Sequence, residues 1–291
     1  MKLAFLIQCH KLPKQLNELL TVLYSEDVQI FIHIDKKSDI KDQIISCSNI
    51  HILPDELRVD VQWGKFSQVS ASINLLRYAF NFGHFDYYWQ ISGQDFPIKS
   101  IEEILLFLEK NNKKNFIHID ESRYNGLNKP NSFDKRAELY FPAWMSNRTF
   151  FVKIIKKLYL IITGGTNYTF PIYRRKMVDK IKPYFGSCWW CLNNDFVEYV
   201  INKIEQEPYL IKFFNNVTCP DESFFQTLFM NSPYADTQAQ YLHYIDWSAG
   251  QSSPKNLTVE DYNHIVSSDK LFARKIDGDF ELIEKMKKNI I

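Results

Sequence analysis

Three acidic residues stand where apolar, strand-like runs of the sequence end. Asp35 follows IFIHI, Asp95 follows YWQISGQ, and Glu222 lies in CPDESFF. Ligands of open α/β sheets bind at the carboxyl ends of the strands, so these carboxylates could meet in one crevice and take or give protons there. Each also has a structural interpretation, because Asp35 could cap a following helix and acids such as Glu222 favour the positive end of a helix.

The short motifs of several large enzyme classes are missing. The sequence has no GxGxxG, GxxxxGK[ST], GxSxG or HExxH. Dinucleotide oxidoreductases, nucleotide-hydrolysing switches, serine hydrolases and zinc peptidases are therefore disfavoured. Cys188 and Cys191 form a lone CxxC in an apolar run, which favours buried strand thiols over a zinc site.

Seven segments, in order, carry a resemblance to a known family. They are IHIDKKSD (32–39), VQWGKFSQVSASINLL (61–76), YYWQISGQDFPIKS (87–100), GSCWWCLNNDFVEYV (186–200), PDESFFQTL (220–228), YIDWSAGQSSPKNLT (244–258) and LFARKID (271–277). Together they resemble the core-2/I-branching β-1,6-N-acetylglucosaminyltransferases and peptide O-xylosyltransferases, glycosyltransferase family 14. The resemblance implies a GT-A type fold and an inverting transfer from a UDP-sugar that needs no metal ion or other cofactor.

The resemblance also implies roles for individual residues. Glu222 matches the family's catalytic glutamate, which would take the proton of the acceptor hydroxyl, and Asp221 beside it would be an N-cap. Lys275 matches the diphosphate-binding lysine, its neighbour Arg274 competes for that role, and Lys255 lies near a second basic position of the family. Such cations would meet the charge that develops on the leaving UDP.

Further matches concern the nucleotide and the sugars. Asp35 matches the uracil-binding aspartate, while Gln8 and His10 match positions that line the base and ribose. Trp63 aligns with an aromatic residue that packs by the nucleotide, with core packing as the alternative. Tyr244, Asp246 and Trp247 fall in the acceptor-side segment, and Asp95 and Ser187 either touch the donor sugar or hold a loop. N-acetylglucosamine is the favoured sugar, and xylose stays open.

Asp277, Gly278 and Asp279 spell DGD, the form of the metal-binding DxD motif of ordinary GT-A enzymes. We discount it because it follows Lys275 directly and lies 12 residues from the end of the sequence. A metal-dependent transferase that uses Asp277 and Asp279 remains one alternative. A catalytically idle protein that binds a sugar or a nucleotide is another.

The elements that must position these residues can be read from the first half of the chain. Strand-like runs at 3–8, 30–34 and 87–92 alternate with helix-period segments at 13–24, 67–82 and 101–110. This order predicts βαβ units, a Rossmann-like and mainly parallel sheet flanked by helices, and one α/β domain over 1–291. The expected helix faces are Val69, Ile73, Leu76 and Phe80, and Ile101, Ile104, Leu105 and Leu108 behind a Ser100–Glu103 capping box.

One segment departs from this pattern. Residues 151–185, in a basic and aromatic insertion at about 135–185, carry eight Lys or Arg and a single acid, Asp179. A solvated helix explains them, and so does binding of an acceptor or of an anionic membrane.

The composition limits the remaining possibilities. A net charge of +1 argues against a nucleic-acid binder, and 15% aromatic residues suit both core packing and sugar stacking. Five cysteines without framework spacing and no long apolar stretch favour a cytoplasmic enzyme, peripheral at the inner face of a membrane at most. The partners that the resemblance implies are a UDP-sugar and a glycan or lipid-linked glycan acceptor for a surface polysaccharide or glycoconjugate.

Overall fold

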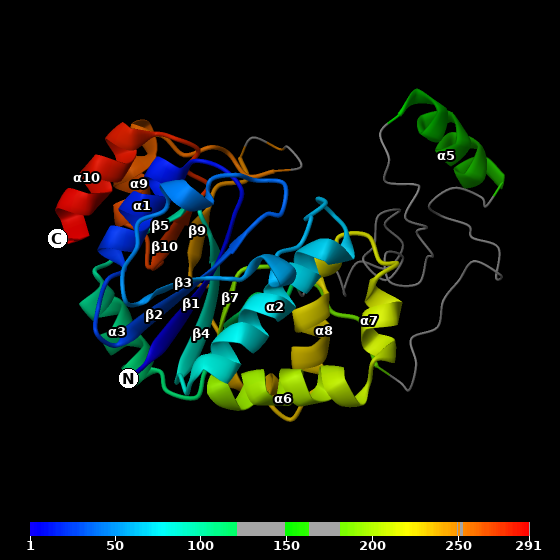
Figure 1. Ribbon diagram of the computed structural model, residues 1–291, viewed down its shortest axis with the longest axis horizontal. Helices are drawn as coiled ribbons and strands as arrows, with labels where there is room; N and C mark the ends of the chain where they lie inside the picture. The colour runs from blue at the N-terminus through cyan, green and yellow to red at the C-terminus, as the bar shows by residue number, and fades with distance from the viewer. Residues whose placement is uncertain (121–148, 163–180, 249, 251–252, 291) are drawn as a thin grey trace.

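The computed structural model describes residues 1–120, 149–162, 181–248, 250 and 253–290 (Figure 1). Its centre is a seven-stranded sheet in the order β3-β2-β1-β4-β7-β6-β8. The strands are β1 (Leu3–Cys9), β2 (Val28–Ile34), β3 (Ile50–Ile52), β4 (Tyr87–Ser92), β6 (Asn115–Ile117), β7 (Trp190–Asn193) and β8 (Gln238–Ala239). Only β7 runs against its neighbours in this sheet, so the predicted α/β fold with a mainly parallel sheet is confirmed.

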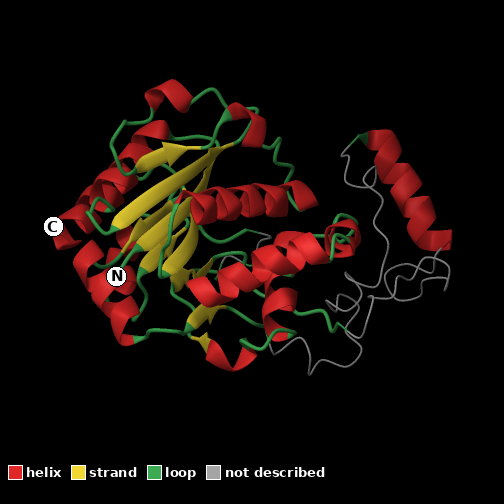
Figure 2. Cartoon of the chain, turned by 60° about the horizontal axis from the view of Figure 1, so that its bottom comes forward, coloured by secondary structure: helices red, strands yellow, loops and turns green. Residues whose placement is uncertain are grey.

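Helices cover both faces of the sheet because the central strands are apolar on both (Figure 2). In β1, Leu3, Phe5 and Ile7 face the helices α1 (Pro13–Val22), α3 (Ile101–Lys110) and α10 (Phe280–Ile290). The alternate residues Ala4 and Leu6 face α2 (Phe66–Phe82), α6 (Asn194–Gln206) and α8 (Phe224–Met230). The two-residue period of a strand thus divides one segment between two cores.

The elements predicted in the first half of the chain are confirmed. Strands 3–8, 30–34 and 87–92 correspond to β1, β2 and β4, and the three helices to α1, α2 and α3. Ser100 and Glu103 form the expected capping box at the start of α3. The predicted faces are buried except at Phe80 and Leu105, which are partly exposed.

A second, three-stranded sheet has the order β5-β10-β9 and consists of β5 (Asp95–Pro97), β10 (Phe272–Arg274) and β9 (His243–Ile245). It places Arg274 opposite Asp95 on one side and Ile245 on the other. Short helices complete the described part of the chain, namely α7 (Tyr209–Phe214) and α9 (Tyr262–Val266).

The basic insertion is described only in part. Helix α5 (Phe150–Ile162) covers a middle section of it, whereas the parts at 135–148 and 163–180, the latter with Arg174, Arg175 and Lys176, lie outside the described residues. Among the helices that are described, none is long and apolar enough to cross a lipid bilayer. The five cysteines are free thiols, and Cys191 is buried in β7 as predicted, while Cys188 lies just before that strand.

Candidate functional site

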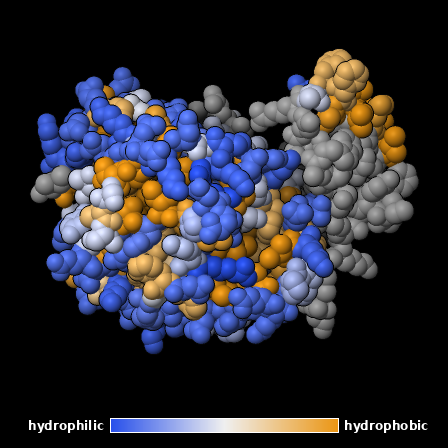
Figure 3. Space-filling model, viewed as in Figure 1, coloured by the Kyte–Doolittle hydropathy of each residue, from blue (hydrophilic) through white to orange (hydrophobic). Residues whose placement is uncertain are grey.

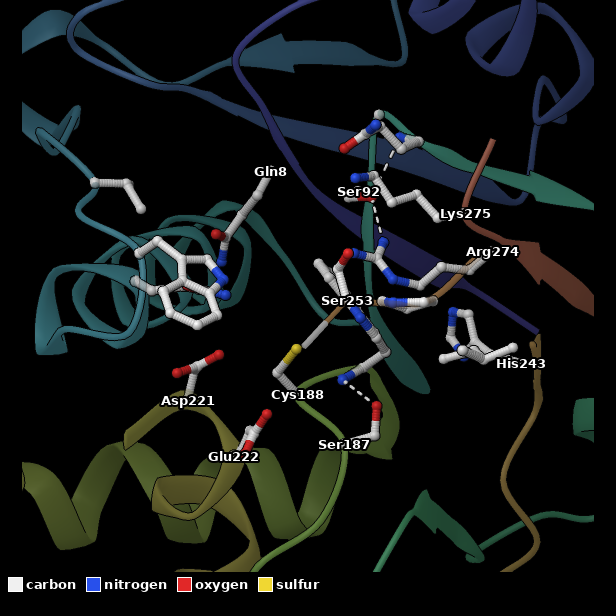
Figure 4. A pocket seen from close by; sticks show the side chains of 18 of the residues that line it. Gln8, Ser92, Ser187, Cys188, Asp221, Glu222, His243, Ser253, Arg274 and Lys275 are labelled. Carbon is white, nitrogen blue, oxygen red and sulfur yellow. Dashed lines mark hydrogen bonds between the residues drawn. The ribbon is translucent and has the colours of Figure 1, made fainter. Parts of the chain in front are cut away.

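A cavity of about 1110 Å³ opens at the carboxyl ends of β1, β2 and β4 (Figure 4). Among the predicted site residues, those that line it are Gln8, His10, Asp35, Trp63, Ser187, Glu222, Trp247, Arg274 and Lys275. Segments that are far apart in the sequence therefore meet where the fold predicts a ligand to bind.

The ends of β1 and β2 build one wall of the cavity. The backbone N–H of Asp35 donates to the carbonyl of Cys9 at 2.9 Å, and its Oδ1 accepts from the N–H of Lys37 at 2.9 Å. Asp35 thus shapes a turn and does not cap a helix. Beside it, Gln8 Nε2 donates to Ser72 Oγ at 2.8 Å. Desolvation and the nearby Lys11 ammonium lower the pKa of His10, so its imidazole is neutral at neutral pH.

Asp95 holds Arg274 at the wall of the cavity. Its Nη1 donates to Ser92 Oγ at 2.7 Å and lies 3.1 Å from Asp95 Oδ1, and its guanidinium stacks on the Trp189 ring at 4.1 Å. Asp95 is fully buried and also accepts from the N–H of Ser92. Asp95 is therefore absent from the cavity lining. Of the three carboxylates expected to meet in one crevice, only Asp35 and Glu222 line the cavity.

Three other predicted residues, Tyr244, Asp246 and Lys255, also lie outside the lining. Lys255 Nζ bonds Asp261 Oδ1 at 2.6 Å, and its backbone N–H donates to the carbonyl of Asp246 at 2.9 Å. Tyr244 is partly buried against the core. These residues support the loop between β9 and β10, while Trp247, with 55% of its surface exposed, reaches the cavity rim.

Lys275 presents a positive charge to the cavity. Its Nζ makes no hydrogen bond or ion pair with the described part of the chain. Desolvation lowers its pKa, the carboxylate of Asp277 partly offsets this effect, and the positive charges of Lys11 and Arg274 lower the pKa further. Lys11 lines the same cavity but is bonded to Asp277 Oδ1 at 2.6 Å. An anion at this wall would meet a cation that has no ion-pair partner among the described residues.

The two aspartates of DGD have separate structural partners. Asp277 Oδ1 accepts from Lys11 and from Gln94 Nε2 at 2.7 Å, and these contacts contribute to lowering its pKa. Asp279 accepts from the N–H of Leu282 at 2.8 Å, at the start of α10. Within the described ranges, no group of three or more His, Cys, Asp or Glu is placed to hold a metal ion.

Glu222 ends the 3₁₀ turn Pro220–Glu222 and lies two residues before α8. Its carbonyl accepts from the N–H of Gly186 at 2.8 Å. A Cβ on Gly186 would lie 1.7 Å from the carbonyl oxygen of His118, so only glycine fits between the two chains. The predicted N-cap role of Asp221 is wrong, because Ser223 is the residue that precedes α8.

The loop of Glu222 is also tied to the loop of Trp63. The N–H of Cys219 donates to the carbonyl of Gly64 at 3.1 Å. Trp63 itself is 69% exposed at the cavity, which excludes the alternative that it packs in the core. An exposed indole at a rim is suited to stack on a flat ligand.

Sequence reasoning missed several lining residues. Lys11 follows His10 directly and could have been found as a cation after β1. Trp189 lies in the segment 186–200 that carries the resemblance, without a predicted role of its own. Tyr241 and His243 carry no local signal, because they reach the cavity only through the pairing of β9 with β10.

Comparisons with known proteins identify a family and several relatives. The model of the family described as Branch, Core-2/I-Branching enzyme, matches residues 3–268. Human xylosyltransferase 1 is 24% identical over 305 residues, covering 95% of this chain and 29% of that protein. Human xylosyltransferase 2 is 25% identical over 312 residues, covering 95% and 32%. The chain thus spans about a third of the length of these relatives.

Among solved structures, one similar chain is residues 1–349 of TarS from S. aureus. It is 11% identical, with a TM-score of 0.41, and the match covers 99% of this chain and 65% of that one.

Proposed function

Because this chain belongs to the Core-2/I-branching enzyme family, we propose that it transfers a sugar from a UDP-sugar to a hydroxyl group of a glycan acceptor. The observation that carries the proposal is that Glu222, Asp35 and Lys275 line one cavity although they come from three distant segments. Glu222 would take the proton of the acceptor hydroxyl, Asp35 would bind the uracil, and Lys275 would bind the diphosphate.

The proposed reaction is a direct displacement with inversion. Glu222 takes the proton of the acceptor hydroxyl while the hydroxyl oxygen forms a bond to the anomeric carbon of the donor sugar. At the same time the bond from that carbon to the β-phosphate oxygen breaks. UDP leaves with the bonding electrons. Lys275 meets the developing charge directly, because it is the cation at this wall without a counterion among the described residues.

Arg274 and Lys11 would act differently from Lys275. The charge of Arg274 is balanced by Asp95, and that of Lys11 by Asp277. Each would therefore orient the diphosphate by hydrogen bonding and add little net positive charge. Lys255 bonds Asp261 outside the lining, and we therefore propose that it holds its loop. Asp277 already binds Lys11 and Gln94, and Asp279 accepts from the N–H of Leu282. These contacts support a transfer without a metal ion.

The remaining lining residues suit the two substrates. Asp35 would accept the uracil N–H, Gln8 and His10 would lie against the base and ribose, and Trp63 would stack at the rim. Trp247 would stack on the acceptor. N-acetylglucosamine is the proposed sugar, with xylose as the alternative.

A panel of UDP-sugars tests the proposed function. Binding to the folded state alone raises thermal stability with ligand concentration, so the true donor should raise the melting temperature in proportion to the logarithm of its concentration. The same donors are then assayed for hydrolysis and transfer, with and without EDTA. Loss of activity in EDTA that manganese restores would favour the metal-dependent alternative, and binding without any turnover would favour the idle binder.

We also propose that the chain docks through helix α5 on an anionic membrane surface, where a lipid-linked acceptor would lie. Figure 3 shows apolar side chains on this helix. Its exposed apolar side chains are Phe150, Phe151, Ile154, Ile155, Leu158, Ile161 and Ile162. Lys153 and Lys157, one turn apart, are exposed on the same helix. Apolar side chains beside lysines match the acyl boundary and the headgroups of anionic lipid.

A further inference from the structure

His243 is a buried polar group whose bonding capacity is unused. Only 3% of its surface is exposed, it lines the cavity, and neither ring nitrogen has a hydrogen-bond partner in the described part of the chain. Buried polar atoms normally have a partner, and leaving one unpaired costs about 1–3 kcal/mol. This imidazole is therefore suited to a partner that enters the cavity.

The protein around His243 offers mainly aromatic surface. The ring packs on Tyr241 at 5.3 Å, Phe272 at 5.9 Å and Trp89 at 6.2 Å between centroids. Asp95 and Arg274 influence it only through their charges, because they bond each other. Burial lowers the pKa of His243 to about 4, so at neutral pH it offers one donor and one acceptor.

Two further neutral groups stand beside it. Tyr241 and Ser187 share a hydrogen bond of 2.7 Å between their hydroxyl oxygens, and both line the cavity. Two hydroxyls that share one hydrogen bond retain capacity for others. Together the three residues present neutral donors and acceptors on an aromatic wall, which suits a hydroxyl-bearing pyranose ring better than a phosphate.

Their position relates this neutral wall to the cationic one. Strand β9, which carries His243, pairs with β10, and Lys275 follows β10 directly. In Figure 4, Lys275, Arg274 and His243 lie along one side of the cavity and Glu222 lies on the other. A sugar bonded to a diphosphate at Lys275 would lie against the neutral wall and remain open to Glu222.

We propose that His243, with Tyr241 and Ser187, forms the subsite for the donor's sugar ring, in which the His243 imidazole hydrogen-bonds a ring hydroxyl. The inference rests on the proposed function and specifies its donor site. It makes His243 a residue that distinguishes UDP-sugar from UDP.

The test compares the dissociation constants of UDP, UDP-N-acetylglucosamine and UDP-xylose for wild type and His243→Phe. Phenylalanine keeps the ring and removes both nitrogens. The affinity for UDP should stay within twofold of wild type. The affinity for the UDP-sugar that binds should fall by about 5- to 10-fold, the loss expected for one hydrogen bond. The KM for the donor should rise with it, and the KM for the acceptor should not change.

Two controls separate bonding from folding. His51→Phe removes a half-buried imidazole outside the cavity lining and should leave both affinities unchanged. His243→Gln and His243→Asn each retain a polar group near one ring nitrogen, and the one that matches the bonding atom should restore part of the affinity. If His243→Phe lowers the melting temperature markedly, the same comparison is made with these two variants.

The outcomes are distinct. An unchanged ratio of UDP-sugar to UDP affinity in all three His243 variants would overturn the subsite while the proposed function stands. A change confined to the acceptor KM would overturn it too and would place His243 at the acceptor. A wild-type chain that binds neither UDP nor any UDP-sugar would overturn the proposed function and the subsite together.

Discussion

Arg274 and Asp95 form a buried ion pair across the β5–β10 ladder, with 3.1 Å between Nη1 and Oδ1. Asp95 is fully buried, and its removal leaves the guanidinium without an ion-pair partner among the described residues. We predict that Asp95→Ala lowers the free energy of unfolding by about 3–5 kcal/mol in urea titrations. Asp269→Ala, which removes an exposed partner of Lys270, should cost less than about 1 kcal/mol. Equal effects of the two would contradict a structural role for Asp95.

Gly186 fixes the loop that carries Glu222. An added Cβ would meet the His118 carbonyl at 1.7 Å, and any shift passes to Glu222 through the 2.8 Å hydrogen bond from Gly186. We predict that Gly186→Ala lowers kcat by at least about tenfold and also lowers the melting temperature, since small misplacements of catalytic groups cost about 10²-fold. Gly83→Ala is the matched control, because a Cβ there has nothing within 4 Å. Normal kcat in Gly186→Ala would refute this coupling.

The affinity for UDP should depend on pH through Lys275. Desolvation, with help from Lys11 and Arg274, lowers its pKa below the ordinary lysine value. Diphosphate binding needs the charged form, so UDP affinity should fall as pH rises through that lowered pKa. Calorimetric titrations between pH 7 and 10 measure it. Lys275→Arg should bind UDP without this decline, because a guanidinium stays charged, and the same decline in that variant would show that another group is responsible.

The membrane proposal concerns the lysines of α5. We predict that Lys153→Glu combined with Lys157→Glu reduces binding to vesicles that contain phosphatidylglycerol by at least about tenfold, since each lysine near an anionic surface contributes about 1 kcal/mol. Vesicle flotation measures the bound fraction. The reversal of two exposed lysines elsewhere, Lys110→Glu with Lys114→Glu, is the control of equal charge change. Equal binding by both variants would rule out docking through α5.

Local patterns in the sequence predicted the elements that depend on local residues. The apolar run of β1, the periodic face of α2 and the Ser100–Glu103 capping box are each contained within one short segment. The resemblance to the family led to part of the cavity lining, including Asp35, Glu222 and Lys275. Two roles for Asp95 were open from the sequence, contact with the donor sugar or support of a loop. The structure buries it outside the cavity lining, because β5 pairs with a strand 179 residues later in the chain. His243 was not predicted for the same reason, since the rings of Trp89 and Phe272 that pack on it come from other strands.

Glu222 is the proposed base of a sugar transfer within this cavity. The most direct test is the turnover of Glu222→Gln, measured together with its affinity for UDP and compared with the adjacent Asp221→Asn. We predict that Glu222→Gln lowers kcat by about 10²–10⁴-fold, the range for general bases, while UDP binds within twofold of wild type. Asp221→Asn should lose much less. Near-normal turnover in Glu222→Gln would contradict the account.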